Sequence, residues 1–286
     1  MRRSTSNSLV FGLGSLLILF SRVLLADPGL SVDSLKNAAF KHKLTIETEA
    51  QFITSDYMGN IYLVDRTELK KYSAEGVLIS SFSDRIAGSI SSVDASNPLR
   101  VQVFYQDFGQ IIYLDDVLSV IGSKISLVDQ GLDQATLSCL SWDDGIWLYD
   151  PQDFELKRLG SDLRLSHQSG NINQLLGIEV DPIYIVEKNN YVYLNDPATG
   201  ILVFDQFGTY YKTLPVRNIE HFQVGSEQVF YLEDGRLMSY DLITFQHANL
   251  SVTSDTNPIL DMRFEKEMRL LAILKEKSLN LFVFQD

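Results

Sequence analysis

Gly59-Asn60-Ile61-Tyr62-Leu63-Val64-Asp65 contains a pattern that returns four more times along the chain: an apolar residue, an aromatic residue, leucine, any residue and aspartate. The other copies are Ile112-Tyr113-Leu114-Asp115-Asp116, Ile146-Trp147-Leu148-Tyr149-Asp150, Val192-Tyr193-Leu194-Asn195-Asp196 and Phe230-Tyr231-Leu232-Glu233-Asp234. Successive aromatic residues lie 51, 34, 46 and 38 positions apart, a mean near 42. Repeats of ~40 to 50 residues are typical of β-propellers, in which each repeat forms one blade.

Short runs rich in valine, isoleucine and aromatic residues divide most repeats into four strands, with Gly or Asn in the first turn, where positive φ is needed. In the first copy, Ile61 and Leu63 point to one face of the strand, and Tyr62 and Val64 point to the other. Both faces are therefore apolar. This pattern predicts a strand packed between two neighbouring sheets.

The last repeat has only three predicted strands, Ile259–Phe264, Arg269–Leu274 and Leu279–Phe284. Near the other end of the chain, Lys43–Glu49 alternates apolar and polar residues but has no neighbouring partner strand. We expect it to complete the last blade, because closing the ring removes exposed sheet edges. The prediction is an all-β, six-bladed propeller of four-stranded antiparallel blades over residues 43–286. Five or seven blades remain alternatives, since the second and sixth repeats are the least regular.

The segment Asp56–Asp65, followed by Leu69-Lys70-Lys71-Tyr72 and Glu75-Gly76, resembles a blade of the NHL-type and related TolB-like six-bladed propellers. The resemblance extends loosely over residues 43–286 and implies the fold. It does not imply one activity, because the group includes protein-binding scaffolds, sugar-lactone hydrolases and ligand domains of receptors.

The lactonase-like members of this group imply a metal ion in the central channel, held by a Glu, an Asn and an Asp from different blades. Glu49, Asn190 and Asp234 match these ligands in residue type only. The repeated aspartates Asp65, Asp116, Asp150, Asp196 and Asp234 follow the central strands. A carboxylate at the end of a strand can accept backbone N–H bonds, so we interpret them as turn-forming residues.

The first 26 residues have the composition of a secretory signal peptide. Arg2 and Arg3 precede the apolar run Leu9–Phe20, and Leu24-Leu25-Ala26 provides small residues before Asp27. Cleavage would leave a lead-in segment, residues 27–42, before the propeller domain and would place the protein in the periplasm or outside the cell. An uncleaved N-terminal membrane anchor is the alternative. The mature chain has no predicted membrane span.

The charge excludes one class of partner. Without the signal segment, 21 basic residues remain against 37 acidic ones, a formal net charge of −16. Nucleic acid requires a basic surface, so we expect no nucleic-acid partner. Cys139 is the single cysteine and lies in an apolar run, which favours a buried thiol over a nucleophile. An exported chain without disulfides fits a bacterial envelope better than a eukaryotic extracellular space.

No catalytic motif is present, and the histidines His42, His167, His221 and His247 lack the spacing of zinc ligands. We therefore predict no catalytic residues, no metal ligands and no cofactor. The candidate binding residues are three aromatic side chains expected at the surface, Trp142, Tyr57 and Tyr210. Trp147 is expected in the core. The insertion Ile86–Asn97 and the loop Gln168–Leu176 are the segments expected to contact a partner.

These observations favour a non-enzymatic, exported propeller that serves as a protein-interaction scaffold in an assembly of the bacterial cell envelope. Two alternatives remain open: a metal-dependent, lactonase-like hydrolase with a divalent cation in the central channel, and a carbohydrate-binding module. The sequence does not identify a small-molecule ligand.

Overall fold

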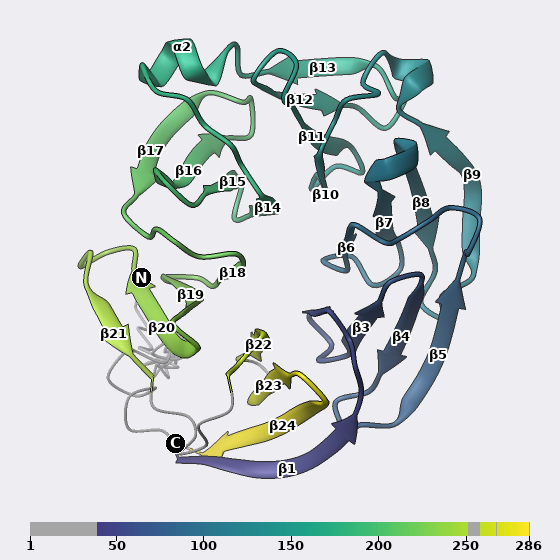
Figure 1. Cartoon of the computed structure of the whole chain (residues 1–286), viewed down its shortest axis with the longest axis vertical. Helices are drawn as coiled ribbons and strands as arrows, with labels where there is room; N and C mark the ends of the chain where they lie inside the picture. Colours follow the sequence, from purple (N-terminus) through teal and green to yellow (C-terminus); the bar gives the residue numbers. More distant parts are fainter. Residues whose placement is uncertain (1–38, 251–257, 267, 286) are drawn as a thin grey trace, which may run out of the picture.

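The computed structural model describes residues 39–250, 258–266 and 268–285. These residues form six four-stranded antiparallel sheets arranged in a ring, a six-bladed β-propeller (Figure 1). The predicted all-β fold and blade number are confirmed. The predicted signal peptide, residues 1–26, and the first part of the lead-in segment, residues 27–38, lie outside the described residues. Within the described part of the chain, no helix is long and apolar enough to cross a bilayer.

Each blade begins with the strand nearest the ring axis and proceeds outward. Blade 1 contains β2 (Phe52–Ser55), β3 (Ile61–Asp65), β4 (Glu68–Tyr72) and β5 (Leu78–Ser83). Blade 2 contains β6 (Ser92–Asp94), β7 (Val101–Tyr105), β8 (Gln110–Leu114) and β9 (Val120–Ser126). Blade 3 contains β10 (Leu137–Leu140), β11 (Ile146–Asp150), β12 (Glu155–Leu159) and β13 (Leu165–Gln168).

The second half of the ring repeats this order. Blade 4 contains β14 (Tyr184–Lys188), β15 (Tyr191–Asp196), β16 (Gly200–Asp205) and β17 (Tyr210–Leu214). Blade 5 contains β18 (Phe222–Val224), β19 (Gln228–Glu233), β20 (Arg236–Asp241) and β21 (His247–Asn249). Blade 6 contains β22 (Asp261–Glu265), β23 (Leu270–Lys275), β24 (Ser278–Gln285) and β1 (Ala39–Glu47). The short helices are η1 (Gln106–Phe108), η2 (Val128–Gln130) and α2 (Ile172–Leu176).

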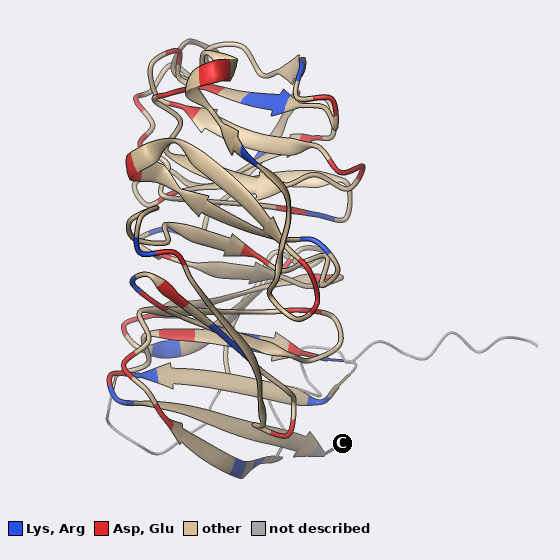
Figure 2. Ribbon diagram, turned by 90° about the vertical axis from the view of Figure 1, so that its right-hand side faces the viewer, with Lys and Arg blue, Asp and Glu red and all other residues tan. Residues whose placement is uncertain are grey.

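The core consists of apolar clusters between neighbouring blades rather than one central core. β3 shows why. Ile61 and Leu63 pack in a cluster with blade 6, whereas Tyr62 and Val64 pack in a cluster with blade 2. All four side chains are at most 2% exposed, so both faces of the strand are buried, as the sequence predicted. In contrast to the apolar residues between the blades, many charged residues lie in the turns at the two faces of the ring (Figure 2).

The ring is closed by the predicted strand. β1 pairs antiparallel with β24, with Leu44 opposite Leu281 and Ile46 opposite Leu279. Both β1 side chains are half-buried against the cluster between blades 6 and 1. The strand begins at Ala39, so residues 39–42 of the predicted lead-in segment belong to the blade. Figure 1 shows β1 on the outside of β24, leading directly into blade 1.

Blade 2 differs from the prediction. The aromatic of the repeat, Tyr113, lies on β8, the third strand, whereas the other four copies lie on second strands. This shift explains the uneven spacings of 51 and 34 residues on either side of it. Both middle strands of blade 2, β7 and β8, are buried on both faces, so the same apolar pattern suits either one.

The two predicted partner loops also have a different structure. Ile86–Asn97 is not an insertion, because it contains β6, the inner strand of blade 2. Gln168–Leu176 contains α2, whose N-cap residue Asn171 accepts a hydrogen bond from the backbone N–H of Gln174 at 2.9 Å. The first segment therefore builds the channel wall, and only the second remains a surface connection.

Candidate functional site

The two faces of the ring carry different turns. Strands alternate in direction, so the turns between first and second strands and those between third and fourth strands share one face. We call it the first-turn face, and the other one, where the chain passes from blade to blade, the return face. Among the described residues, exposed aromatic side chains are more numerous in the turns of the first-turn face: Tyr57, Trp142, Phe207 and Phe245, each at least 57% exposed, with Tyr211 near them at the start of β17. The return face has Phe108 and Phe154, at 53% and 37%.

Asp56 builds the turn that presents Tyr57. Its carboxylate is 2% exposed and accepts the backbone N–H of Met58 at 2.9 Å and that of Asn60 at 3.0 Å. It also accepts the hydroxyl of Tyr62 at 2.9 Å. The buried carboxylate of Asp56 therefore fixes the turn that carries Tyr57, whose side chain is 64% exposed.

The same carboxylate is part of a buried charged group. The Lys71 Nζ lies 3.9 Å from an Asp56 oxygen and donates to the backbone carbonyl of Asp116 in the next blade at 2.9 Å. Burial, followed by the negative charge of Asp56, raises the pKa of Tyr62 far above its usual range. Tyr62 therefore stays a neutral hydrogen-bond donor to Asp56 at physiological pH.

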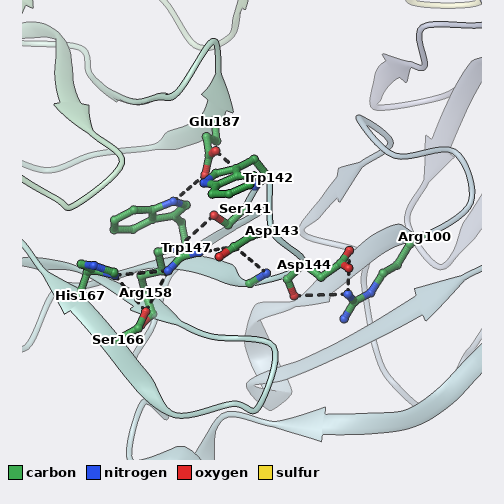
Figure 3. A network of polar contacts seen from close by, with 11 residues as sticks. Arg100, Ser141, Trp142, Asp143, Asp144, Trp147, Arg158, Ser166, His167 and Glu187 are labelled. Atoms are coloured by element: carbon green, nitrogen blue, oxygen red, sulfur yellow. Dashed lines mark hydrogen bonds and ion pairs between the residues drawn. The ribbon is translucent and has the colours of Figure 1, made fainter.

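Trp142 lies in the turn between β10 and β11 and is 69% exposed (Figure 3). Side chains of three blades fix this turn. Glu187 of blade 4 accepts the backbone N–H of Trp142 at 3.2 Å, and Arg100 of blade 2 forms an ion pair with Asp144 at 3.1 Å. Asp144, at φ 65°, has the left-handed conformation in this turn, although the sequence pattern assigns positive φ in first turns to Gly or Asn and Gly145 is the next residue.

Arg158 supplies the third support, from within blade 3. Its guanidinium forms an ion pair with Asp143, donates to the Ser141 hydroxyl at 3.0 Å and lies 5.9 Å from the ring centre of Trp147. The hydrogen bond from Arg158 lowers the pKa of Asp143 below its usual value. Asp143 is consequently ionised at neutral pH, and the ion pair persists there.

Glu187 joins the exposed and the buried tryptophan. Its other carboxylate oxygen accepts the indole N–H of Trp147 at 2.7 Å (Figure 3). Trp147 is fully buried, as predicted. Burial raises the pKa of Glu187, which the hydrogen bonds from its neighbours partly oppose. The network thus ties an exposed aromatic side chain to the core of the molecule.

Tyr210, the third predicted binding residue, is half-buried. Its ring packs against Phe204 with a centroid distance of 5.8 Å, and its hydroxyl hydrogen bonds with that of Thr213 at 2.8 Å. The neighbouring Tyr211 is 58% exposed and stacks on Tyr191. Tyr57 and Trp142 are presented by first turns of blades 1 and 3, whereas Tyr210 lies on the outermost strand of blade 4. A binding role for any of the three stays a prediction.

The carboxylates that line the central channel show whether a metal ion could be held there. The half of the channel nearer the first-turn face is a cavity of about 180 Å³ lined by Asp94, Glu187 and Glu265, among others. Each carboxylate is already used: Asp94 accepts the backbone N–H of Leu140 at 2.9 Å, and Glu265 accepts the Ser55 hydroxyl. Among the described residues, no three His, Cys, Asp or Glu side chains are grouped so that they could hold a metal ion.

The three residues that match lactonase ligands in type do not come together. Glu49 lies in the exposed connection between β1 and β2, Asn190 in a first turn, and Asp234 in a turn on the return face. Cys139 is 1% exposed, and burial raises the pKa of its thiol, in agreement with a structural role.

The repeated aspartates fall into two groups. Asp150 and Asp196 are buried, and each accepts a backbone N–H just after its strand, from Gln152 at 3.0 Å and from Thr199 at 2.6 Å. These two are structural, as predicted. The remaining three are exposed: Asp65, Asp116 and Asp234.

Comparison with known proteins supports the fold. No family model and no curated protein matches the chain. Among solved structures, the chain is similar to a streptogramin B lyase, with a TM-score of 0.61, 10% identity and coverage of 87% of this chain and 98% of the other. The WD40 domain of Pan2 from Neurospora crassa gives a TM-score of 0.58 at 7% identity, covering 86% and 96%.

A third similar structure is a catalytically inactive histidine-to-alanine variant of virginiamycin B lyase from Staphylococcus aureus with quinupristin. Its TM-score is 0.55 at 10% identity, with coverage of 81% of this chain and 79% of the other. At identities of 7 to 10%, these similarities concern the propeller fold alone.

Proposed function

We propose that this protein is a non-enzymatic, exported interaction scaffold that binds a protein partner through its first-turn face. The observation that carries the proposal is the turn of Trp142, which side chains from three blades hold in place although the indole is 69% exposed. Tryptophan and tyrosine are enriched among the few residues that supply most of the binding energy of protein interfaces. A turn that is already ordered loses little conformational freedom on binding, which favours affinity.

The other exposed aromatic residues support the same face. Tyr57 is presented by the turn that Asp56 fixes, and Tyr211 stacks on Tyr191. A partner that spans several blades would bury several of these side chains together. The chain has a formal charge of −13, so a partner with basic residues at the rim of the contact would associate faster.

Capture from the native host tests the proposal. The bait proteins are the wild type, the double variant Trp142→Ala and Tyr57→Ala, and the control Phe108→Ala on the return face. After chemical cross-linking in cells, quantitative mass spectrometry compares the captured proteins. We expect one set of envelope proteins to be captured by the wild type and the control, and reduced about tenfold or more with the double variant. Equal capture by all three baits would contradict the proposal.

Export is a separate part of the proposal, supported by the composition of residues 1–26. Cell fractionation with N-terminal sequencing tests it. We expect a periplasmic or secreted protein that begins at Asp27. Recovery of the whole chain from the membrane fraction would instead support the N-terminal anchor.

A further inference from the structure

The half of the channel nearer the return face contains a cavity of about 140 Å³. Its wall includes residues from all six blades, so it lies on the axis of the ring. In blade order, the lining residues include Phe52, Ser92, Ser138, Tyr184, His221 and Arg263. The cavity is distinct from the first-turn face, and a ligand could bind there whether or not that face binds a partner.

The charge of this wall is unusual for the molecule. The chain carries 37 acidic residues and a formal net charge of −13, yet Arg263 is the single formally charged side chain among the described residues that line the cavity. Burial lowers the pKa of His221, so its imidazole is neutral at pH 7. No carboxylate lines this part of the channel within the described residues, although Arg263 also borders the other half, where Asp94, Glu187 and Glu265 lie.

Arg263 is held in place by the carboxylate of Asp261, which also accepts hydrogen bonds from backbone N–H groups. Its Nη1 donates to Asp261 at 2.8 Å and to the backbone carbonyl of Met262 at 2.6 Å. Asp261 is 2% exposed and also accepts the backbone N–H groups of Ile53, at 2.9 Å, and Met262, at 2.8 Å. Asp261 thus fixes the blade 6–blade 1 junction and orients the guanidinium.

A guanidinium has five N–H donors in a planar fork that matches a carboxylate. The hydrogen bonds of Arg263 with the described residues all use Nη1, which leaves the donors on Nη2 and Nε for a ligand. Arg263 is 7% exposed, so a carboxylate bound there would be shielded from bulk water. A charge-assisted bond in such surroundings is stronger than one at the surface.

Aromatic rings form the adjacent part of the wall. The rings of Tyr184 and His221 meet edge to face at a centroid distance of 5.2 Å, and Phe52 lies 6.5 Å from His221. A dry apolar cavity of about 150 Å³ is large enough for benzene in another protein. The size and chemistry of this cavity therefore suit a planar body of about one aromatic ring.

We propose that this cavity binds a small planar organic carboxylate, with the carboxylate on Arg263 and the apolar body against Phe52, Tyr184 and His221. The site would make the protein responsive to a small organic acid.

The test uses three probes of the same shape: benzoate, the neutral benzamide and the cationic benzylamine. Titration of the whole mature protein, followed by calorimetry and by NMR shifts of the Tyr184 and His221 signals, measures each affinity. We expect saturable binding of benzoate that is at least about tenfold tighter than that of benzamide, and no binding of benzylamine. Equal affinities for benzoate and benzamide, or no saturable binding of benzoate, would overturn the proposal.

A variant pair locates the site. Removing Arg263 alone would leave Asp261 buried and unpaired, which could unfold the protein. The double variant Asp261→Asn and Arg263→Met removes both charges, and Arg164→Met, which removes an exposed arginine next to β13, is the control. We expect benzoate affinity to fall at least about tenfold in the double variant only. Unchanged affinity in a folded double variant would show that Arg263 serves only the ion pair. If the double variant does not fold, the probe comparison on the wild type decides.

Discussion

At the residue scale, the repeated pattern does not tell which aspartates are structural: Asp150 and Asp196 are, but Asp65 is not, and Asp56 lies outside the pattern. Asp65 belongs to the repeated pattern but is exposed, whereas Asp56, five residues before the pattern begins at Ile61, is buried and accepts four hydrogen bonds. The sequence pattern reveals residues that recur in the blades. It does not reveal which of them has unsatisfied donors around it.

Replacing Asp56 with Asn tests this distinction. The amide has one acceptor oxygen in place of two and cannot balance the charge of Lys71, so buried donors lose their partner. We expect a loss of about 2 to 4 kcal/mol in the free energy of unfolding, measured by urea denaturation. The matched control is Asp65→Asn, for which we expect a change within about 0.5 kcal/mol. Equal effects of the two substitutions would contradict the assignment.

His221 makes stability depend on pH. Its folded-state pKa is lowered, chiefly by burial, so the unfolded chain takes up a proton at pH values where the folded chain does not. The free energy of unfolding therefore falls as the pH drops below about 6.5, by at most about 1.4 kcal/mol per pH unit. The loss continues until the folded-state pKa is reached.

Urea denaturation between pH 8 and pH 5 measures this effect. We expect His221→Gln to show a smaller loss of stability toward pH 5 than the wild type. Phe204→Leu is the control, because it removes a buried ring from a cluster that does not contain His221 and leaves every titrating group in place. It should lower stability equally at every pH. The same pH slope in the wild type and His221→Gln would contradict the role of His221.

At the element scale, most blades could be predicted because each strand carries its own evidence. β3, β11, β15 and β19 are apolar on both faces, and turn residues bound them. Blade 2 could not be predicted in register, because β7 and β8 are equally apolar and either fits a central position. β6 has three residues, too few for a periodic pattern.

The candidate site was predicted only in part, for a related reason. The exposed Trp142 could be inferred from its place beside Asp143 and Asp144 in a turn. The residues that hold its turn could not be inferred, because Arg100 and Glu187 lie 42 and 45 residues from Trp142, in other blades. Contacts around a ring join positions that share no local motif, so the sequence of one blade cannot indicate them.

Substitutions in β1 should affect the stability of the whole ring, because this strand closes it. Ile46 packs against the cluster between blades 6 and 1, and a charge there would be buried without a partner. We expect Ile46→Asp to lower the free energy of unfolding by about 2 to 4 kcal/mol in thermal or urea denaturation. The adjacent Thr45→Asp, which points to the exposed side, should have an effect below about 1 kcal/mol. A larger loss of stability for Thr45→Asp than for Ile46→Asp would contradict this register of β1.

At the scale of the whole molecule, both proposed sites depend on the ring staying closed. The six inner strands form one channel only if blade 6 contacts blade 1, and the bond from Ile53 to Asp261 crosses this junction. The first-turn face and the channel cavity lined by Arg263 both combine residues from several blades. Opening the ring would separate their parts, although each blade kept its own sheet.

Disulfide trapping of the closing strand pair tests this account most directly. Thr45 on β1 lies opposite Asn280 on β24, and both are accessible, whereas the native Cys139 is buried. We predict that Thr45→Cys with Asn280→Cys forms a disulfide under mild oxidation and raises the melting temperature, because the crosslink restrains the unfolded chain. Thr45→Cys with Ser278→Cys, one diagonal step away, should crosslink poorly. Failure of the 45–280 pair to crosslink in folded protein, or equal crosslinking of both pairs, would contradict a ring closed by β1.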